Sequence, residues 1–398
     1  MAPESRHGRP FEKAATFSRS TYSALGRLTS PQRDTEWATK ERYGTAVEST
    51  RTVSVGSEAS FEPVPIPGSG GSLAPVDLAA EIAAWVNSEA MQALLNHFHA
   101  PDMPSALGAR LEALEAFTAE EWDFRRAGGG GSVERNQVNL SAIDDPVAER
   151  LVEAAATALG LVGPRKPLRP DYDFIVVLGG LVRANLWRAA YAAHLLRSGV
   201  VSAPRVVALT AHRPLAANPD DPDRDEFSLL DRVGLPSAAL ESEVMEDSLK
   251  VVFGVNNLDD LVADEEDVPL EGRRRVARTT TDAGLELTLV VAPPADPTSG
   301  TRADTGQTYR FWAEEVDRIR PETKVLVSTT SIYVPYHALV ALQHLGLPFA
   351  ATVETIGYDE QAIDTSAAPQ IFRAVNFVQE IRSAVRAAAQ LCAQLGLS

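Results

Sequence analysis

The sequence predicts an α/β protein, a three-layer sandwich built on a mostly parallel, Rossmann-like sheet and preceded by a smaller helical region. Two features carry this prediction. Short runs rich in β-branched residues recur from residue 174 onward, and segments with apolar residues at helical spacing separate them. Strands that are buried on both faces appear as continuous apolar runs. Their alternation with helices is typical of a parallel sheet that helices cover on both sides.

The composition changes along the chain and divides it into three regions. Residues 1–72 are rich in Ser, Thr, Arg and Glu and end in PVPIPGSGGS, so we expect a flexible N-terminal arm and linker there. Residues 73–165 show helical spacing of apolar side chains and form the expected helical region. Residues 166–398 contain all the predicted strands and form the expected α/β ligand-binding domain.

Three helices are predicted in the helical region. The first has Asp77 as its N-cap, and the second and third follow near Leu107 and Val147, where apolar residues recur at steps of three and four. Between the last two, the segment from Trp122 to Asn136 places arginines around four consecutive glycines. A basic lid over an anionic ligand and a charged surface loop both fit this pattern.

Five strands and four helices are predicted in the α/β domain. The strands are expected at residues 174–178, 205–209, 285–292, 324–329 and 349–355. The helices are expected at residues 184–198, 225–233, 306–319 and 335–345. The acidic segment 241–275 lies between the second and third strands, and we expect it to form a solvated, charged face.

Composition and charge exclude several classes of function. A formal net charge of −17 disfavours general nucleic-acid binding, because phosphate backbones are attracted by basic surfaces. A single cysteine, Cys392, excludes an intrachain disulfide and a multi-cysteine zinc site, and its apolar helical context predicts a buried side chain. The histidines form no metal-binding pattern. Neither a membrane-spanning run nor a signal sequence is apparent, so we expect a cytoplasmic protein without a membrane partner.

Polar residues follow the first two predicted strands, at the edge of an α/β sheet where ligands bind. Gly179, Gly180 and Arg183 come after the first strand. A glycine turn and an arginine in the first helical turn can hold a phosphate or carboxylate, although a tight strand-to-helix connection also explains the glycines. Thr210 and His212 follow the second strand, and His212 is a candidate acid or base.

Two later segments add hydroxyl groups at the same expected edge. Thr305 and Thr308 lie at the start of the helix after the third strand, where a helix N-terminus suits an anionic or polar ligand. Ser328 and Thr329 open a run of four hydroxyl residues after the fourth strand. Because four consecutive hydroxyls exceed what one helix cap needs, we expect some of them to face the ligand.

In the order and spacing of these motifs, residues 173–358 resemble the ElyC/SanA/YdcF family, a bacterial α/β domain. The matching stretches are DFIVVLGG, VVALTAHRPL, DEFSLLDRVGLPSAALESE, ADTGQTYRFWA and KVLVSTTSIYVPYH. The second-strand loop lacks the glycines of the family pattern, and Ile332-Tyr333 replaces its aromatic-histidine pair. The resemblance adds Glu226 to the residues selected above as a wall of the ligand pocket. It also implies S-adenosylmethionine as a cofactor for one branch of the family, and the cofactor here is left open between S-adenosylmethionine and a nucleotide.

Two functions are compatible with these residues. The first is an enzyme, a transferase or hydrolase acting on an anionic, nucleotide-like or phosphorylated small molecule, with Glu226 or His212 as the catalytic base. In this hypothesis the amides of Gly179 and Gly180 hold the anion together with Arg183. The second is a regulatory module that binds a nucleotide or S-adenosylmethionine without converting it. The many polar residues at the strand ends favour the first, and the absence of a recognisable set of nucleophile, base and orienting residue supports the second as the alternative.

Overall fold

The computed structural model describes residues 60–125, 138–264, 268–299 and 301–397. These residues belong to one compact unit, Ser57–Ser398, which clusters separately from Met1–Gly56. Most of the expected N-terminal arm and most of the four-glycine segment therefore lie outside the described residues.

A seven-stranded sheet forms the centre of the unit, with the strand order β3-β4-β5-β2-β1-β6-β7. β5, β2, β1, β6 and β7 run parallel, whereas β4 is antiparallel to β5 and β3 to β4. The strands are β1 (Phe174–Leu178), β2 (Arg205–Thr210), β3 (Asp259–Ala263), β4 (Arg275–Thr280), β5 (Glu286–Val291), β6 (Lys324–Thr329) and β7 (Thr352–Gly357). The predicted α/β class with a mostly parallel sheet is confirmed.

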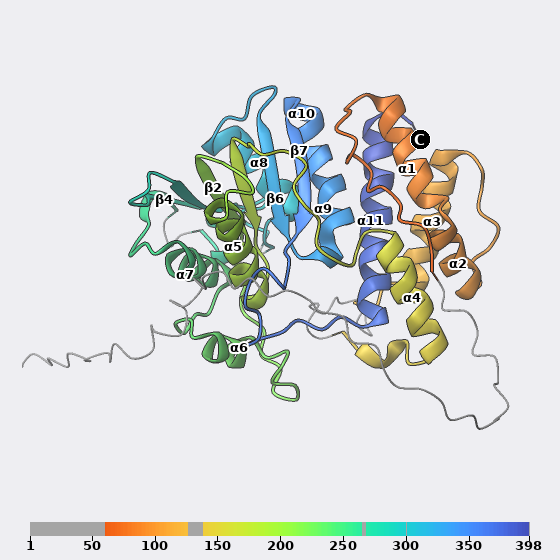
Figure 1. The fold of residues 1–398 in the computed structure, drawn as a ribbon, viewed down its shortest axis with the longest axis horizontal. Helices are drawn as coiled ribbons and strands as arrows, with labels where there is room; N and C mark the ends of the chain where they lie inside the picture. Colours follow the sequence, from red (N-terminus) through yellow and green to blue (C-terminus); the bar gives the residue numbers. More distant parts are fainter. Residues whose placement is uncertain (1–59, 126–137, 265–267, 300, 398) are drawn as a thin grey trace, which may run out of the picture. The chain divides into compact units, whose positions relative to one another are not determined.

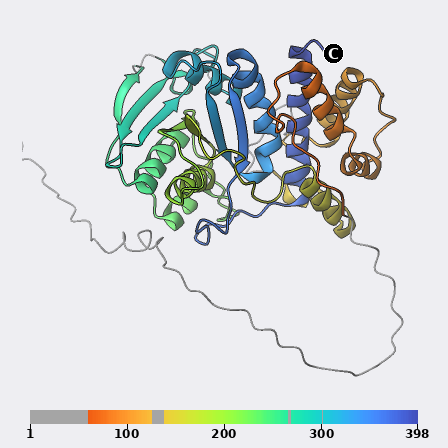
Figure 2. The same ribbon diagram turned by 45° about the horizontal axis from the view of Figure 1, so that its top comes forward.

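Helices cover both faces of the sheet and complete the three layers (Figure 2). Along β1, Phe174, Val176 and Leu178 point into one hydrophobic cluster, and Ile175 and Val177 point into the other. The helices of the α/β part are α5 (Val182–Arg197), α6 (Glu226–Val233), α7 (Glu241–Phe253), α8 (Thr305–Phe311), α9 (Val334–Ala341), α10 (Leu347–Phe349) and α11 (Ala374–Gln394). Short turns of 3-10 helix are η4 (Leu140–Ala142), η5 (Leu270–Gly272) and η7 (Ser331–Tyr333), and π-helical turns are η6 (Trp312–Val316) and η8 (Leu342–Gly346).

The N-terminal helices are α1 (Pro75–Val86), α2 (Glu89–His97), α3 (Leu107–Glu121) and α4 (Pro146–Ala158). Of these, α1, α3 and α4 pack against the C-terminal helix α11, and α2 packs against α4. Figure 1 shows α11 between α9 on the side of the sheet and α3 and α4 on the other. Because α11 contacts both sides, one hydrophobic cluster runs from the sheet into the N-terminal helices. The C-terminal helix α11 therefore packs the N-terminal helices against the α/β part of the chain.

Two sequence-based expectations about local structure are wrong, and a third holds only in part. In the segment 241–275, α7 buries Val244, Met245 and Leu249, whereas β3 is exposed, so only part of this segment is the solvated face that was expected. Its charges pair with each other, because Arg275 donates to Glu246 and to Asp260 at 2.5 and 2.6 Å. The first helix begins at Pro75, so Asp77 is not its N-cap. The last strand begins at Thr352 because the residues before it form α10.

Candidate functional site

A cavity of about 590 Å³ lies at the carboxyl ends of the parallel strands. Its walls come from the residues after β1, β2 and β6, the first turn of α8, and the segment that leads into α11. The chain passes from β1 to β2 on one side and later crosses to β6 on the other side of β1. The cavity therefore sits where the strand order reverses, the usual ligand site of open α/β sheets.

The amide groups of the glycine turn after β1 are engaged within the protein. Gly179 N donates to Leu209 O at 2.7 Å, and Gly180 N donates to Asn185 Oδ1 at 2.8 Å. A Cβ atom at position 179 would lie 2.9 Å from Leu209 O and in conflict with Glu241. Close packing thus requires glycine here, and the two amides are not free to hold an anion as the sequence hypothesis assumed.

Arg183, in the first turn of α5, is the best-placed cation for an external anion. Its Nε donates to Ala368 O at 3.1 Å. In the part of the chain that the structure describes, its Nη atoms form no hydrogen bond or ion pair. Partial burial lowers the pKa of Arg183, but a guanidinium group stays charged at neutral pH. Its two Nη groups can therefore donate to a ligand in a bidentate manner.

A buried ion pair forms a second part of the wall, between Arg213 after β2 and Glu241 at the start of α7. Glu241 also accepts a hydrogen bond from Thr210 Oγ1 at 2.9 Å. This arrangement fixes the position of the Arg213 guanidinium at the cavity. The sequence analysis selected Thr210 but missed both Arg213 and Glu241, because Glu241 lies in the segment interpreted as a solvated face.

Glu226 lies at the start of α6, and it is a buried carboxyl group of the cavity whose pKa is strongly raised. Its side chain is 4% exposed and accepts a hydrogen bond from Val182 N at 2.8 Å. Burial raises the pKa of Glu226 to about 7, and the charge of Glu241 adds to this, whereas the Val182 amide, Arg213 and Arg183 oppose it. A carboxyl of this kind is present in both protonation states near neutral pH.

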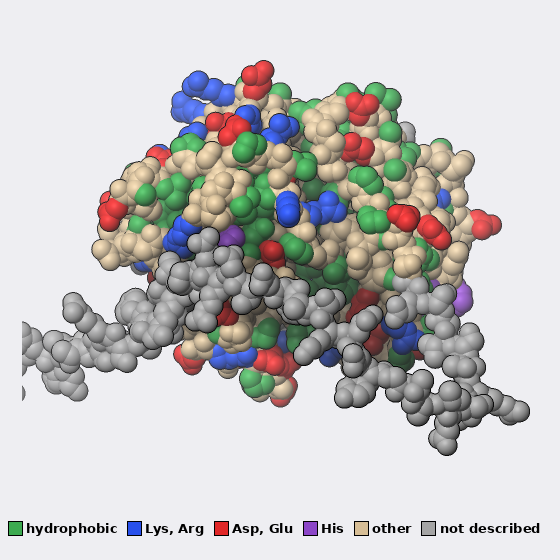
Figure 3. Space-filling model, viewed as in Figure 1, with side chains coloured by type: hydrophobic (Ala, Val, Ile, Leu, Met, Phe, Trp, Pro, Cys, Tyr) green, Lys and Arg blue, Asp and Glu red, His purple; other side chains and the backbone are tan. Residues whose placement is uncertain are grey.

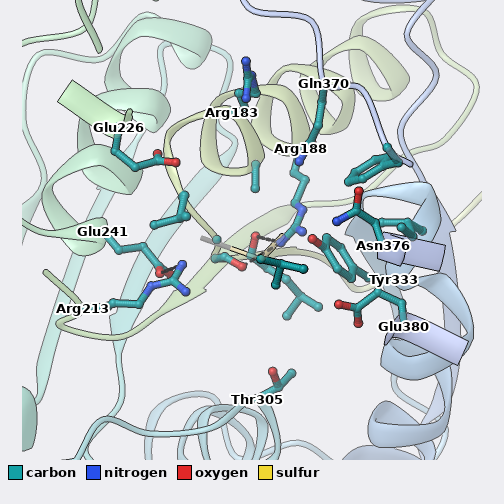
Figure 4. Close-up of a pocket in the computed structure, with 18 of the residues that line it drawn as sticks. Arg183, Arg188, Arg213, Glu226, Glu241, Thr305, Tyr333, Gln370, Asn376 and Glu380 are labelled. Atoms are coloured by element: carbon teal, nitrogen blue, oxygen red, sulfur yellow. Dashed lines mark hydrogen bonds and ion pairs between the residues drawn. The ribbon is translucent and has the colours of Figure 1, made fainter. Parts of the chain in front are cut away.

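Arg188 holds the carboxyl ends of β1 and β6 together. Its Nη1 donates to the carbonyls of Leu178 and Gly179 at 2.9 and 2.7 Å. Its Nε and Nη2 both donate to Thr330 Oγ1 at 3.1 Å, and its guanidinium lies 5.5 Å from the centre of the Tyr333 ring. Figure 4 shows it at the centre of the site. The sequence analysis missed Arg188 because its helical spacing is that of a core residue.

The structure brings only some of the other predicted residues to the cavity. Thr305 and Thr308 line it, and the Thr308 hydroxyl donates to Asp304 O at 2.8 Å. Ser328 and Thr329 do not line it, since the first donates to Arg188 O and the second bonds to His337.

His212 also lies outside the cavity, with its Nδ1 2.8 Å from Ser242 Oγ. Burial lowers the pKa of His212, and the charges of Arg275 and Arg273 lower it further. The structure therefore gives His212 no position from which to act on a ligand in this cavity.

The first turns of α11 form the wall opposite Glu226 and Arg213 (Figure 4). Asn376, Gln379 and Glu380 lie on its cavity side, next to Tyr333 and Phe372. The sequence analysis assigned no role to this helix. A signal was present, because these three polar residues recur at steps of three and one in the first two turns of a strongly amphipathic helix.

Arginine dominates the charge of the cavity. The described residues that line it include eight arginines and six carboxyl side chains, although the whole chain has a net charge of −17. On the face drawn in Figure 3, basic and acidic side chains are interspersed rather than gathered by sign. An excess of guanidinium groups in the cavity of an acidic protein favours an anionic ligand.

Two further searches of the described residues gave no site. They contain no group of His, Cys, Asp and Glu side chains that could hold a metal ion. None of the described helices has the length and apolar character needed to span a membrane. Cys392 is buried in α11, as its sequence context predicted.

Comparisons with known proteins show relatives over most of the chain. A family model described as the Rv3785 N-terminal domain matches residues 69–160, which contain α1 to α4. The chain is similar to the uncharacterized protein Rv3785 of Mycobacterium tuberculosis and to the uncharacterized protein Mb3814 of Mycobacterium bovis. Each is 28% identical over 328 residues, which cover 78% of this chain and 88% of the relative. No solved structure matches the chain.

These relatives overturn the resemblance to the ElyC/SanA/YdcF family. The matching family model and the relatives are of the Rv3785 type instead. The expectation of S-adenosylmethionine came from that resemblance alone and loses its support. The strand-end residues were selected from their positions in the predicted sheet, so they do not depend on it. Glu226 does not depend on it either, because the structure itself places this residue in the cavity.

Proposed function

We propose that this protein is an enzyme that binds an anionic, phosphorylated or nucleotide-like small molecule in the cavity and transfers or hydrolyses one of its groups. The observation that carries the proposal is the pairing of an arginine-rich cavity with a buried carboxyl whose pKa is about 7. Cavities with cationic binding groups and a carboxyl of raised pKa are typical of active sites.

Arg183 and Arg213 bind the anion in this proposal. Arg183 offers unoccupied Nη groups, and Arg213 is held in place by Glu241. Both charges act on Glu226, so they lie on its side of the cavity. The hydroxyl of Thr305, at the N-terminal end of α8, orients the substrate from a third edge of the cavity (Figure 4).

Glu226 is the general base or acid. In its ionised form it accepts a proton from water or from the hydroxyl of an acceptor molecule, and in its protonated form it donates one to a leaving group. No serine or cysteine is found among the described residues that line the cavity. The attacking group is therefore water or a second substrate rather than a serine or cysteine of the enzyme.

The test combines binding and turnover. Each variant is incubated with a panel of phosphomonoesters and nucleoside phosphates, and phosphate release and probe mass are followed. Arg183→Ala is expected to weaken binding, and Glu226→Gln to retain binding while turnover falls at least about 100-fold. Arg150→Ala and Glu89→Gln are matched controls, because both residues are exposed on N-terminal helices outside the cavity.

The two functions separate in this experiment. Binding without conversion by either the original protein or Glu226→Gln supports a non-catalytic binding module. Conversion that Glu226→Gln leaves unchanged contradicts the role of Glu226.

A further inference from the structure

We infer that the α11 wall of the cavity is a nucleobase subsite, so that the anionic ligand is a nucleotide. The inference rests on the proposed function, since it takes the arginine side of the cavity as the phosphate site. Three observations carry it: a buried amide without a hydrogen-bond partner, aromatic side chains that line the same cavity, and the separation of the two walls.

The amide belongs to Gln379. Its side chain is 4% exposed and lines the cavity. Oε1 is buried without a hydrogen-bond partner, and no hydrogen bond of the side-chain amide is found among the described residues. A buried polar group without a partner is destabilising by roughly 1–3 kcal/mol. A ligand that supplies the missing donor and acceptor removes this penalty.

An amide offers a donor and an acceptor side by side, and the edges of nucleobases offer the complementary pair. Glutamine recognises adenine in this bidentate way. A phosphate or sugar hydroxyl does not present such a planar, paired edge. The chemistry of Gln379 thus favours a base over the other parts of a nucleotide.

Two aromatic side chains that line the same cavity as Gln379 suit the faces of a base. The rings of Tyr333 and Phe372 have their centres 6.4 Å apart and are nearly perpendicular, and both line the cavity. Next to them, Ile371 lines the cavity and is 72% exposed. An apolar side chain so exposed at a cavity gains from contact with a flat apolar group, and aromatic side chains are common stacking partners of bases.

The walls are arranged for a ligand with two different ends. Figure 4 shows Glu226, Glu241 and Arg213 on one side and Asn376 and Glu380 of α11 on the other. The volume of about 590 Å³ is in the range of sites for small molecules of this size. Arg183 and Trp187 both donate to Ala368 O, which fixes the segment leading to Phe372 and α11 against α5.

The inference is tested by calorimetric titration of the full chain with two kinds of probe. AMP, GMP, CMP and UMP carry a base, whereas ribose 5-phosphate keeps the sugar and the phosphate but lacks it. We expect at least one mononucleotide to bind at least about tenfold more tightly than ribose 5-phosphate.

Variants assign the difference to the α11 wall. Gln379→Leu keeps the approximate size of the side chain and removes its ability to hydrogen-bond a ligand, and Phe372→Ala removes a ring that lines the cavity and precedes α11. Each is expected to lower mononucleotide affinity about tenfold and to leave ribose 5-phosphate affinity unchanged. Gln390→Leu, on the exposed side of α11, and Phe227→Ala, 42% exposed on α6, are the matched controls. Arg183→Ala is expected to lower the affinity for both kinds of probe.

The outcomes distinguish the subsite from the proposed function. Equal affinity for ribose 5-phosphate and all four mononucleotides, with both lost in Arg183→Ala, overturns the base subsite and leaves the anion site in place. If both Gln379→Leu and Phe372→Ala still bind a mononucleotide more tightly than ribose 5-phosphate, the base subsite does not lie at the α11 wall. No binding of any probe at millimolar concentration overturns the subsite and counts against the proposed function as well.

Discussion

Replacing Glu226 by glutamine removes a buried carboxyl while keeping the shape of the side chain. The glutamine Oε1 can still accept the hydrogen bond from Val182 N, which Glu226 accepts at 2.8 Å. What changes is the ability to ionise. Because burial raises the pKa of Glu226 to about 7 from its ordinary value of 4.5, the substitution is expected to change how the stability of the protein depends on pH.

The sign and size of this effect follow from proton linkage. The folded protein holds the proton of Glu226 more tightly than the unfolded chain does. Its contribution to stability is therefore fully present below pH 4.5 and is lost as the pH rises through about 7. For these two pKa values, the loss between pH 5 and pH 8 is about 2.5 kcal/mol. Glutamine does not ionise, so the variant does not suffer this loss.

The assay is urea unfolding of the original protein and of Glu226→Gln at pH 5, 6, 7 and 8. The difference in unfolding free energy between the variant and the original protein is expected to grow in favour of the variant by about 2.5 kcal/mol over this range. Glu89→Gln is the control, because Glu89 is exposed in the first turn of α2 and should give curves parallel to the original. Parallel curves for Glu226→Gln would refute the argument that burial controls this carboxyl.

Other substitutions test other parts of the site. Gly179→Ala is expected to destabilise the protein by about 1–3 kcal/mol in urea unfolding, because the added Cβ would meet Leu209 O and Glu241; an unchanged midpoint would show that the turn has room. Arg213→Leu should cost about 3–5 kcal/mol by leaving Glu241 buried without its ion-pair partner. Adding Glu241→Leu should recover much of that loss, and an equal loss in the double variant would argue against the ion pair as its cause. If Glu226 acts as a base, kcat/KM should rise with pH up to about pH 7 and then level off, and a decline over that range would instead assign it the role of an acid.

The sheet was the part of the fold that the sequence predicted best. Buried parallel strands such as β1 and β2 appear as continuous apolar runs, and their limits were placed within one or two residues. The segment 241–275 is only in part the solvated face that was expected, because one side of α7 is buried while β3 is exposed. Its charges are numerous, but Arg275 is paired with Glu246 and Asp260, so a charged sequence can form a helix and two ordered strands.

The cavity was predicted only where it depends on strand ends. The rule that ligands bind at the carboxyl ends of parallel strands led to Gly179, Arg183 and Thr210, which all line it. It could not lead to Arg188, whose role depends on side-chain contacts across the sheet. Nor could it lead to Gln379, because α11 reaches the cavity only through long-range packing between α9 and the N-terminal helices.

The measurement that tests the central claim most directly is native mass spectrometry of the purified protein, followed by denaturation and identification of released small molecules. Arg183→Ala is the comparison, and Arg150→Ala is the control. A phosphorylated or nucleotide-like molecule that leaves with the original protein and with the control, and is missing from Arg183→Ala, is the predicted result. A molecule without an anionic group, or one retained equally by Arg183→Ala, would contradict the claim that the arginine-lined cavity binds an anion.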